Sequence, residues 1–165
     1  MASTTRRLRR EGKSVSMKTL DFRSCPRRPG QNGKPGDIAS RAMDANDRPF
    51  VDDLGQPIWF VLREFLLART GDESFTQGLQ PIEAMELQLE TRKAIKAQCS
   101  VDDGLFVFED AQATRLAKAI LHPAQGYMAA SAPCLYPYLL PAQKMIDGDA
   151  RAASAPGQAV EVPSN

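Results

Sequence analysis

One histidine and two thiols are the side chains in this 165-residue chain that come closest to a catalytic base and its nucleophile. His122 is the only histidine, and Cys99 and Cys134 lie within the segment that is expected to fold. Such a pair needs the thiol beside the imidazole and a third group that orients the ring. His122 precedes Pro123, where a helix should end, and the helix dipole alone favours a cation there. Because no sequence context activates either cysteine, we predict a non-enzymatic protein without catalytic residues.

An acidic cluster between residues 44 and 53 has the oxygen ligands that Ca²⁺ prefers. Its members are Asp44, Asp47, Asp52 and Asp53. An EF-hand loop that begins at Asp44 needs glycine at its sixth position and glutamate at its twelfth, where this chain has Pro49 and Gly55. The pattern therefore fails. We predict a solvated loop and no metal site.

Three glycines at 30, 33 and 36 lie among basic residues, as in a phosphate-binding loop. The Walker pattern requires Gly-Lys-Ser/Thr before a helix, but Gly33-Lys34 is followed by Pro35. We expect a loose linker here and no cofactor. With one histidine and three unevenly spaced cysteines, the chain also lacks the residues for a multi-histidine metal site or a disulfide framework.

Basic residues are concentrated at the N-terminus. Residues 1–41 contain eleven Lys or Arg and three Asp or Glu, whereas residues 42–165 contain ten basic and seventeen acidic residues. The densest part is Arg6, Arg7, Arg9, Arg10 and Lys13. Like charges this close repel one another, so residues 1–16 are expected to form a disordered basic arm.

This arm could contact nucleic acid. Five neutralised phosphates would give a salt slope of roughly −4 to −5 on duplex DNA. No aromatic residue precedes Phe22, so the arm offers no surface for base stacking. The alternatives are a solvated tail or an arm that docks on the acidic remainder of the chain. Met17 is an alternative start, which would make residues 1–16 an upstream extension.

The elements that would position these residues begin with a strand at 17–23, where Leu20 and Phe22 share one side. Proline and glycine predict a flexible loop at 24–48. A hairpin should follow around Gly55, and a helix should begin at Pro57. Its expected core face is Ile58, Val61, Leu62, Phe65 and Leu66.

A second helix is predicted from Pro81 to about Gln98. Ile82, Met85 and Leu89 form one stripe on it, and Leu87, Ala94 and Ile95 form another, so we expect it to touch neighbours on two sides. Residues 105–108 have the composition of a strand, which could pair with the strand at 17–23. A third helix should run from Glu109 or Asp110 to His122. Its core face is Ala113, Leu116, Ala117, Ile120 and Leu121.

The C-terminal part contains Pro133, Pro137 and Pro141, each of which removes a helix donor. We expect a short helix at 124–131, an extended or kinked apolar segment at 133–141, and a last turn at 141–147. Residues 148–165 read as a disordered tail. In the apolar segment, polar and apolar residues do not alternate in a way that would leave one side exposed to water. It is therefore the best interaction candidate. With the start of the helix at Pro57 it gives an expected protein interface of Trp59, Phe60, Leu135, Tyr136 and Tyr138. The alternative is that these aromatic side chains pack in the core.

The order of these elements resembles small tailed-bacteriophage proteins of unassigned role, encoded among virion structural genes. The resemblance covers about residues 17–146. It is carried by Met17-Lys-Thr-Leu-Asp-Phe, by Gly55-Gln-Pro-Ile before the apolar run from Trp59, by Arg92-Lys93-Ala94-Ile95, and by the strand and helix from Phe106 to Ile120. It implies a cytoplasmic or virion-associated accessory or assembly protein, and it carries over no catalytic residues.

Together these patterns predict an α+β fold with three to four helices on a two- or three-stranded sheet. A single domain at 17–147 should carry the disordered segments at both ends. The longest apolar run, Ile58–Leu62, is too short to cross a bilayer, so no membrane partner is expected. We predict an interaction or assembly protein that binds a protein partner or itself. The second hypothesis is a nucleic-acid-associated protein that uses the basic arm.

Overall fold

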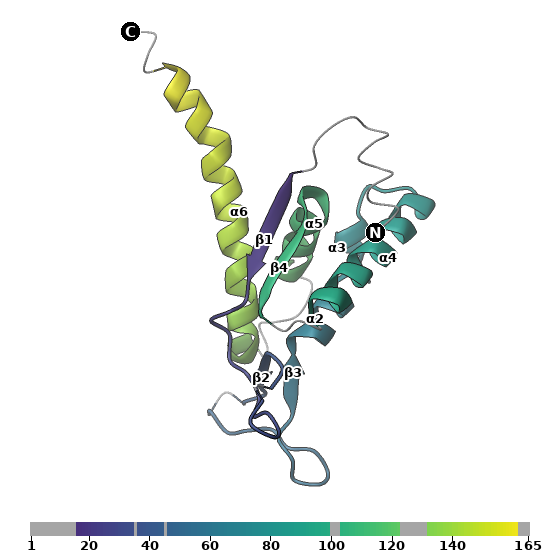
Figure 1. The fold of residues 1–165 in the computed structure, drawn as a ribbon, viewed down its shortest axis with the longest axis vertical. Coiled ribbons are helices and arrows are strands. Elements are labelled where there is room, and N and C mark those ends of the chain that lie inside the picture. The colour runs from purple at the N-terminus through teal and green to yellow at the C-terminus, as the bar shows by residue number, and fades with distance from the viewer. Residues whose placement is uncertain (1–15, 35, 45, 100–102, 123–131, 162–165) are drawn as a thin grey trace.

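The computed structural model describes residues 16–34, 36–44, 46–99, 103–122 and 132–161, with side chains in the last helix from 134 to 154. Within these residues the fold is α+β, as predicted, with five helices and two small antiparallel sheets (Figure 1). The strands are β1 (Met17–Asp21), β2 (Ala39–Arg41), β3 (Trp59–Val61) and β4 (Leu105–Glu109). The helices are α2 (Leu62–Arg69), α3 (Glu73–Thr76), α4 (Pro81–Cys99), α5 (Asp110–Leu121) and α6 (Ala132–Glu161).

The pairing of β1 with β4 confirms the long-range contact that the sequence predicts. The strands are antiparallel, and Leu20 lies opposite Phe106. Alternation places Leu20, Phe22, Phe106 and Phe108 on one face, where each is at most 3% exposed. The rings of Phe22 and Phe106 meet edge to face at 5.6 Å. This face is one wall of the core.

Helix α5 packs on that core as its periodicity predicts. Its first turn is closed by a capping box in which the Glu109 N–H donates to Gln112 Oε1 at 3.3 Å. Ala113, Leu116, Ala117 and Ile120 are fully buried. The helix ends at Leu121, just before His122, where it was expected to end.

The predicted helix from Pro57 is wrong in its first part. Residues 59–61 form β3, which pairs with β2, and α2 begins only at Leu62. The aromatic and β-branched side chains in this run favour an extended backbone once a partner strand is present. Val61 is accordingly extended, with φ −78° and ψ 130°. Ile58, expected in the core, is 39% exposed.

The loop at 24–48 contains regular structure that the sequence does not predict. Strand β2 lies inside it, and Arg27 bridges Ile38 while the Arg28 N–H donates to the Asp37 carbonyl at 3.0 Å. Gly36 allows the two arms to come this close, because a Cβ there would lie 2.1 Å from the Arg28 carbonyl oxygen. The prolines and glycines shape a hairpin here.

Helix α6 contradicts the kinked segment expected at 133–141. It is continuous through all three prolines and extends beyond 147, where a disordered tail was predicted, to Glu161. Pro133 lies in the first turn, where a missing N–H costs nothing. Pro141 leaves the Pro137 carbonyl without a helical donor, and the buried Cys25 thiol donates to that oxygen at 3.1 Å. The lost helical bond is therefore replaced from outside the helix.

The long helix is also held just past its middle, at Asp149. Lys18 of β1 lies 2.6 Å from Asp149 of α6 and 2.7 Å from Asp110 of α5. The ion pairs place residues beyond 147 against the domain, as Figure 1 shows for the course of α6 beside β1. The predicted short helix at 124–131 lies outside the described residues, as do residues 162–165 of the expected tail. No helix in the described ranges has the length and hydropathy needed to cross a membrane.

Helix α4 has the predicted bounds but packs on one side only. Thr91 and Ile95 are fully buried, and Leu87 and Ala94 are partly buried against the core. The stripe of Ile82, Met85 and Leu89, which was expected to contact a second neighbour, is exposed to solvent. That expectation is therefore wrong, because no described element covers this face.

Candidate protein interface

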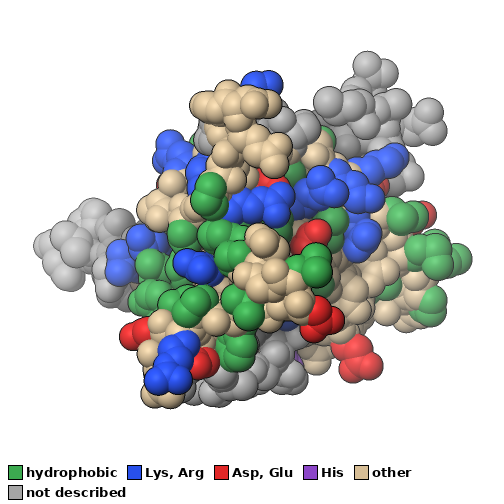
Figure 2. All heavy atoms as spheres, turned by 90° about the horizontal axis from the view of Figure 1, so that it is seen from below, with side chains coloured by type: hydrophobic (Ala, Val, Ile, Leu, Met, Phe, Trp, Pro, Cys, Tyr) green, Lys and Arg blue, Asp and Glu red, His purple; other side chains and the backbone are tan. Residues whose placement is uncertain are grey.

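The end of the molecule that carries β2 and β3 presents a cluster of exposed apolar side chains. We call these residues, which project from one hairpin, the hairpin cluster: Phe50 (43% exposed), Val51 (51%), Leu54 (84%) and Ile58 (39%). Figure 2 views this end of the molecule and shows hydrophobic side chains gathered beside Lys and Arg side chains. Exposed apolar side chains with a charged border are typical of a surface that another macromolecule covers.

Backbone hydrogen bonds give the hairpin cluster a defined shape. The Ala42 peptide lies between the two arms, donating its N–H to the Ile58 carbonyl at 2.9 Å and accepting the Phe50 N–H at 3.0 Å. The Ile58 N–H in turn donates to the Phe50 carbonyl at 3.1 Å. Three short segments thus brace one another, and the apolar side chains have to point outward from this thin unit.

Aspartates from the predicted acidic cluster shape the loops of this end. Asp44 Oδ1 accepts the N–H groups of Asn46 and Arg48 at 2.8 and 2.9 Å. Asp52 Oδ1 accepts the N–H groups of Leu54 and Gln56, both at 2.9 Å. Such Asx turns organise a loop through its own backbone. In the described part of the chain, no group of three or more His, Cys, Asp or Glu is placed to hold a metal ion.

The five residues of the expected interface fall into two environments. Leu135 is 5% exposed and Tyr138 is fully buried, so these two belong to the core and correct the prediction. They face inward because α6 is continuous, which puts positions 135, 138 and 142 on one side. Trp59 and Phe60 are half-buried in β3, and Tyr136 is 59% exposed.

Tyr138 ties the apolar end to helix α6. Its hydroxyl donates to the Phe60 carbonyl at 2.5 Å, and its ring lies 5.4 Å from that of Phe65. Burial raises the pKa of Tyr138 above its ordinary value, so the hydroxyl keeps its proton and remains a donor. The β3 backbone is thereby anchored on the core side while its hairpin stays exposed.

Two buried thiols contact backbone groups in the same region. The Met43 N–H lies 2.9 Å from Cys134 Sγ, and Cys25 bonds the Pro137 carbonyl as described above. Burial raises the pKa of Cys25 to about 11, so its thiol stays protonated near neutral pH. Cys134, considered above as a nucleophile, lies at the start of α6 and contacts the Met43 backbone with its sulfur. Both groups act here as packing and hydrogen-bonding elements.

A groove of about 700 Å³ runs between β1 and α6. Thr19 and Asp21 line one wall, and Tyr136, Leu140 and Met145 line the other. Near the groove, Arg23 donates to both carboxylate oxygens of Asp21 at 2.9 and 2.8 Å, and these bonds lower the pKa of Asp21 to about 2. The groove is therefore the second place where the expected interface, through Tyr136, reaches solvent.

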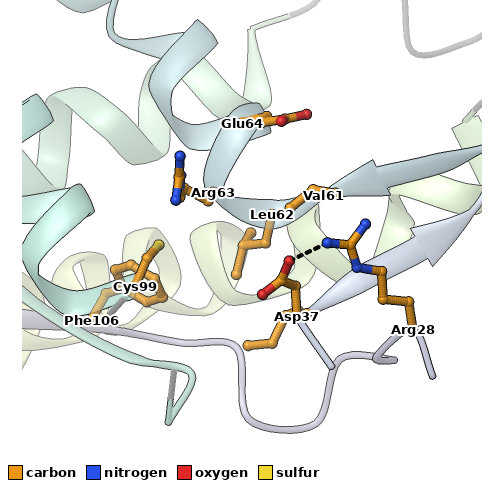
Figure 3. A pocket seen from close by; sticks show the side chains of 9 residues that line it. Arg28, Asp37, Val61, Leu62, Arg63, Glu64, Cys99 and Phe106 are labelled. Atoms are coloured by element: carbon orange, nitrogen blue, oxygen red, sulfur yellow. Dashed lines mark hydrogen bonds and ion pairs between the residues drawn. The ribbon is translucent and has the colours of Figure 1, made fainter. Parts of the chain in front are cut away.

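A smaller pocket of about 250 Å³ lies between α2, β4 and the loop before β2 (Figure 3). Arg28 points toward Asp37 and forms an ion pair with it at 2.5 Å, while Cys99 lies beside Phe106 at the other end. Its volume lies just below the range of about 300–1,000 Å³ that is usual for small-molecule sites. The Arg28–Asp37 pair closes the hairpin at 27–38, so its charges already have a structural partner.

The residues of the basic arm lie outside the described residues. Arg6, Arg7, Arg9, Arg10 and Lys13 therefore have no structural account here, and nucleic-acid contact through them stays a prediction. The sequence pattern did not single out the hairpin cluster. The sequence signal of this cluster is two apolar pairs that flank the turn, Phe50-Val51 and Pro57-Ile58. Among the residues that the structure describes, no third strand is long enough to cover them. Comparison with family models, with curated proteins and with solved structures finds no match to this chain.

Proposed function

We propose that this protein acts by binding another protein through the hairpin cluster, as an interaction or assembly protein without an enzymatic role. The observation that carries the proposal is the exposure of four large apolar side chains within nine residues, which includes 84% for Leu54. Covering such side chains gains roughly 25 cal/mol for each Å² removed from water. Water-exposed apolar residues on a braced hairpin therefore favour a partner that buries them.

The border of the cluster indicates the chemistry of this partner. Arg41 in β2 and Arg48 in the adjoining turn are both exposed. Figure 2 likewise shows Lys and Arg side chains next to the hydrophobic area. Asp47, Asp52 and Asp53 of the same end are exposed as well. A matching surface would therefore have an apolar centre and charged groups of both signs at its edge, because complementary charge sets orientation and speeds association.

The resemblance in layout to small tailed-phage proteins extends this proposal. Under it, the partner is another protein of the same virion or its assembly pathway, and the protein works in the host cytoplasm or on the particle. The support is the order of elements from residue 17 to 146. Capture of a virion protein in the experiment below would strengthen this extension.

The test is a quantitative capture experiment with matched variants. Full-length protein, the double variant Val51→Glu/Leu54→Glu and the variant Tyr136→Glu are immobilised and exposed to extract from cells that carry the gene. The hairpin residues are exposed, so each variant should keep its stability to within about 0.5 kcal/mol, which urea unfolding verifies. The captured protein is then purified and its Kd is measured against all three forms.

The expected result is one protein that wild type and Tyr136→Glu bind equally and that Val51→Glu/Leu54→Glu binds at least about a hundredfold more weakly, a loss of about 2.8 kcal/mol. Equal binding by all three forms would reject the hairpin cluster as the interface. Loss of binding only with Tyr136→Glu would move the interface to the groove beside α6. Salt-sensitive capture of nucleic acid by all three forms, abolished by deleting residues 1–16, would favour the alternative function.

A further inference from the structure

The outer face of α4 carries a second exposed apolar surface. We call Ile82, Met85 and Leu89 the α4 stripe. They are 73%, 62% and 58% exposed and occupy positions i, i+3 and i+7, so they lie on one side of the helix. The opposite side of α4 packs on the domain through Thr91 and Ile95. This surface is separate in sequence from the hairpin cluster, and it does not rest on the function proposed above.

Charges on the same helix are divided between its two halves. Glu83 and Glu86 lie in the N-terminal half, and Lys93 and Lys96 lie in the C-terminal half. All four side chains are exposed. A surface that is acidic at one end and basic at the other complements a copy of itself turned by 180°. It would repel a copy that lies parallel to it.

The spacing of these charges fits one particular register. The midpoint between Glu86 and Lys93 falls between residues 89 and 90, and the midpoint between Glu83 and Lys96 falls at the same place. Because each residue rises about 1.5 Å along a helix, an antiparallel copy centred there brings both glutamates level with the lysines of its partner. Leu89 then lies at the symmetry axis.

The same register covers the apolar stripe. Ile82 lies at the level of Ala97 and Met85 at the level of Ala94, each one residue from a lysine of the partner copy. The aliphatic stem of a lysine can cover an apolar side chain while its ammonium group reaches a carboxylate nearby. Leu89 meets its symmetry copy, as the isologous contact of a two-fold dimer requires.

We infer that α4 is a homodimer interface, on which a second copy of this chain lies antiparallel. The pair Glu86–Lys93 forms twice between the two copies, because both side chains flank the α4 stripe, and Leu89 packs on Leu89 at the axis. One helix on each side makes a small interface, so the dimer should be weak and its population should depend on protein concentration. A dimer also presents two hairpin clusters, which increases avidity for a partner that repeats.

The experiment is sedimentation equilibrium of the full-length protein from about 5 to 200 µM, which spans the range expected for a weak complex. Wild type should show a monomer–dimer equilibrium. Leu89→Glu should weaken dimerisation at least about tenfold, because two like charges would then meet at the axis. Tyr136→Glu is the matched control, since Tyr136 is 59% exposed against 58% for Leu89. It should leave the dimer unchanged.

Charge reversal tests the register. Glu86→Lys and Lys93→Glu should each weaken the dimer, since each places like charges opposite one another twice. The double variant Glu86→Lys/Lys93→Glu should restore the dimerisation Kd to within about threefold of wild type, because the ion pairs form again with their charges exchanged. High salt should weaken wild type and the double variant alike.

Three results would overturn the inference. The first is a wild-type protein that stays monomeric at the highest concentration. The second is a dimer that Leu89→Glu leaves intact or that Val51→Glu/Leu54→Glu abolishes, since the interface would then lie elsewhere. The third is a double charge reversal that dimerises no better than the single ones, which would reject the antiparallel register.

Discussion

Helices α4 and α5 carry apolar residues at similar spacing but differ in whether those residues are buried. In α5, Ala113, Leu116, Ala117 and Ile120 are fully buried between the sheet and α6. In α4, the three residues of the stripe are 58–73% exposed. Periodicity thus predicts that a segment is helical, but it does not predict that anything covers the apolar face.

The two helices also differ in the balance of the contacts that attach them. Apolar packing covers most of one face of α5, and Arg115 adds hydrogen bonds to the Phe75 and Gln77 carbonyls at 3.0 and 2.9 Å. Polar side chains hold α4 through backbone groups of its neighbours: Gln88 Nε2 donates to the Thr70 carbonyl at 2.9 Å, and Arg92 donates to the Leu67 carbonyl at 3.0 Å. Gln98 pairs with both the N–H and the carbonyl of Val107 at the outer edge of β4, at 2.6 and 2.9 Å. A helix attached in this way can leave an apolar stripe free for a partner.

A matched pair of leucine truncations gives the largest expected difference between the two helices. Leu116→Ala opens a cavity in the core and should lower the free energy of unfolding by about 2–5 kcal/mol. Leu89→Ala removes an exposed side chain and should change it by no more than about 0.5 kcal/mol. Urea unfolding measures both, at a protein concentration low enough to keep the wild type monomeric.

Equal losses would break the comparison, because they would show that the α4 stripe is covered within the monomer. If Leu89→Ala loses stability only at high protein concentration, the loss belongs to the dimer, because association stabilises the folded state by mass action.

How far the sequence predicted the fold follows from this contrast. The strands β1 and β4, the bounds of α4 and the core face of α5 all came from short-range patterns, because each has a local signal in side-chain alternation, caps or helical spacing. The strand at 59–61 did not, because only β2, about twenty residues earlier, makes that backbone extended. The continuous α6 was missed because its freed carbonyl is satisfied by Cys25, more than a hundred residues away.

The candidate interface was predicted only in part, for the same reason. Tyr136 is exposed, but Leu135 and Tyr138 were assigned to a surface because the prolines suggested an irregular segment. The hairpin cluster and the α4 stripe were taken as core or left unassigned. Exposure of an apolar residue depends on what is absent around it, and no pattern within the segment records that absence.

Arg92 offers the next largest effect, because it tests whether polar contacts hold α4. Its guanidinium donates to the Leu67 carbonyl at 3.0 Å and to Thr70 Oγ1 at 3.3 Å. Arg92→Met keeps the aliphatic stem but removes these bonds, and should lower the free energy of unfolding by about 1–3 kcal/mol. Lys93→Met, on the exposed side of the same helix, is the control and should be close to neutral when both variants are measured at a concentration that keeps the protein monomeric. A neutral Arg92→Met would show that Ile95 and its apolar neighbours suffice.

Thr91 tests the buried side of α4 with a smaller effect of opposite sign. Its hydroxyl is buried without a hydrogen-bond partner among the described residues. Thr91→Val keeps the shape and removes the unsatisfied group, so it should raise the free energy of unfolding by about 1 kcal/mol. Thr91→Ser, which keeps the hydroxyl and leaves a small void, should lower it. Destabilisation by valine would mean that the hydroxyl does find a partner in solution.

The smallest expected effect concerns the pH dependence of stability and tests the charge at the first turn of α5. The pKa of Asp110 is lowered in the folded protein, first by its hydrogen bond with Lys18 and then by that with Thr114, against the opposing effect of burial. A lowered carboxyl pKa stabilises the fold above the unfolded value of about 3.9, and this contribution is lost as the pH falls through the folded value.

Wild type should therefore lose more stability on acidification below about pH 4 than Asp110→Asn does, by less than about 1 kcal/mol, because the Asp110 side chain is 48% exposed and water screens the pair. Lys18→Met should flatten the same part of the pH profile, and the double variant should flatten it little further, since both remove one interaction. Urea unfolding at low salt across this range measures the difference. A profile that Asp110→Asn leaves unchanged would mean that α5 draws no stability from charge at its first turn, and that packing holds this helix.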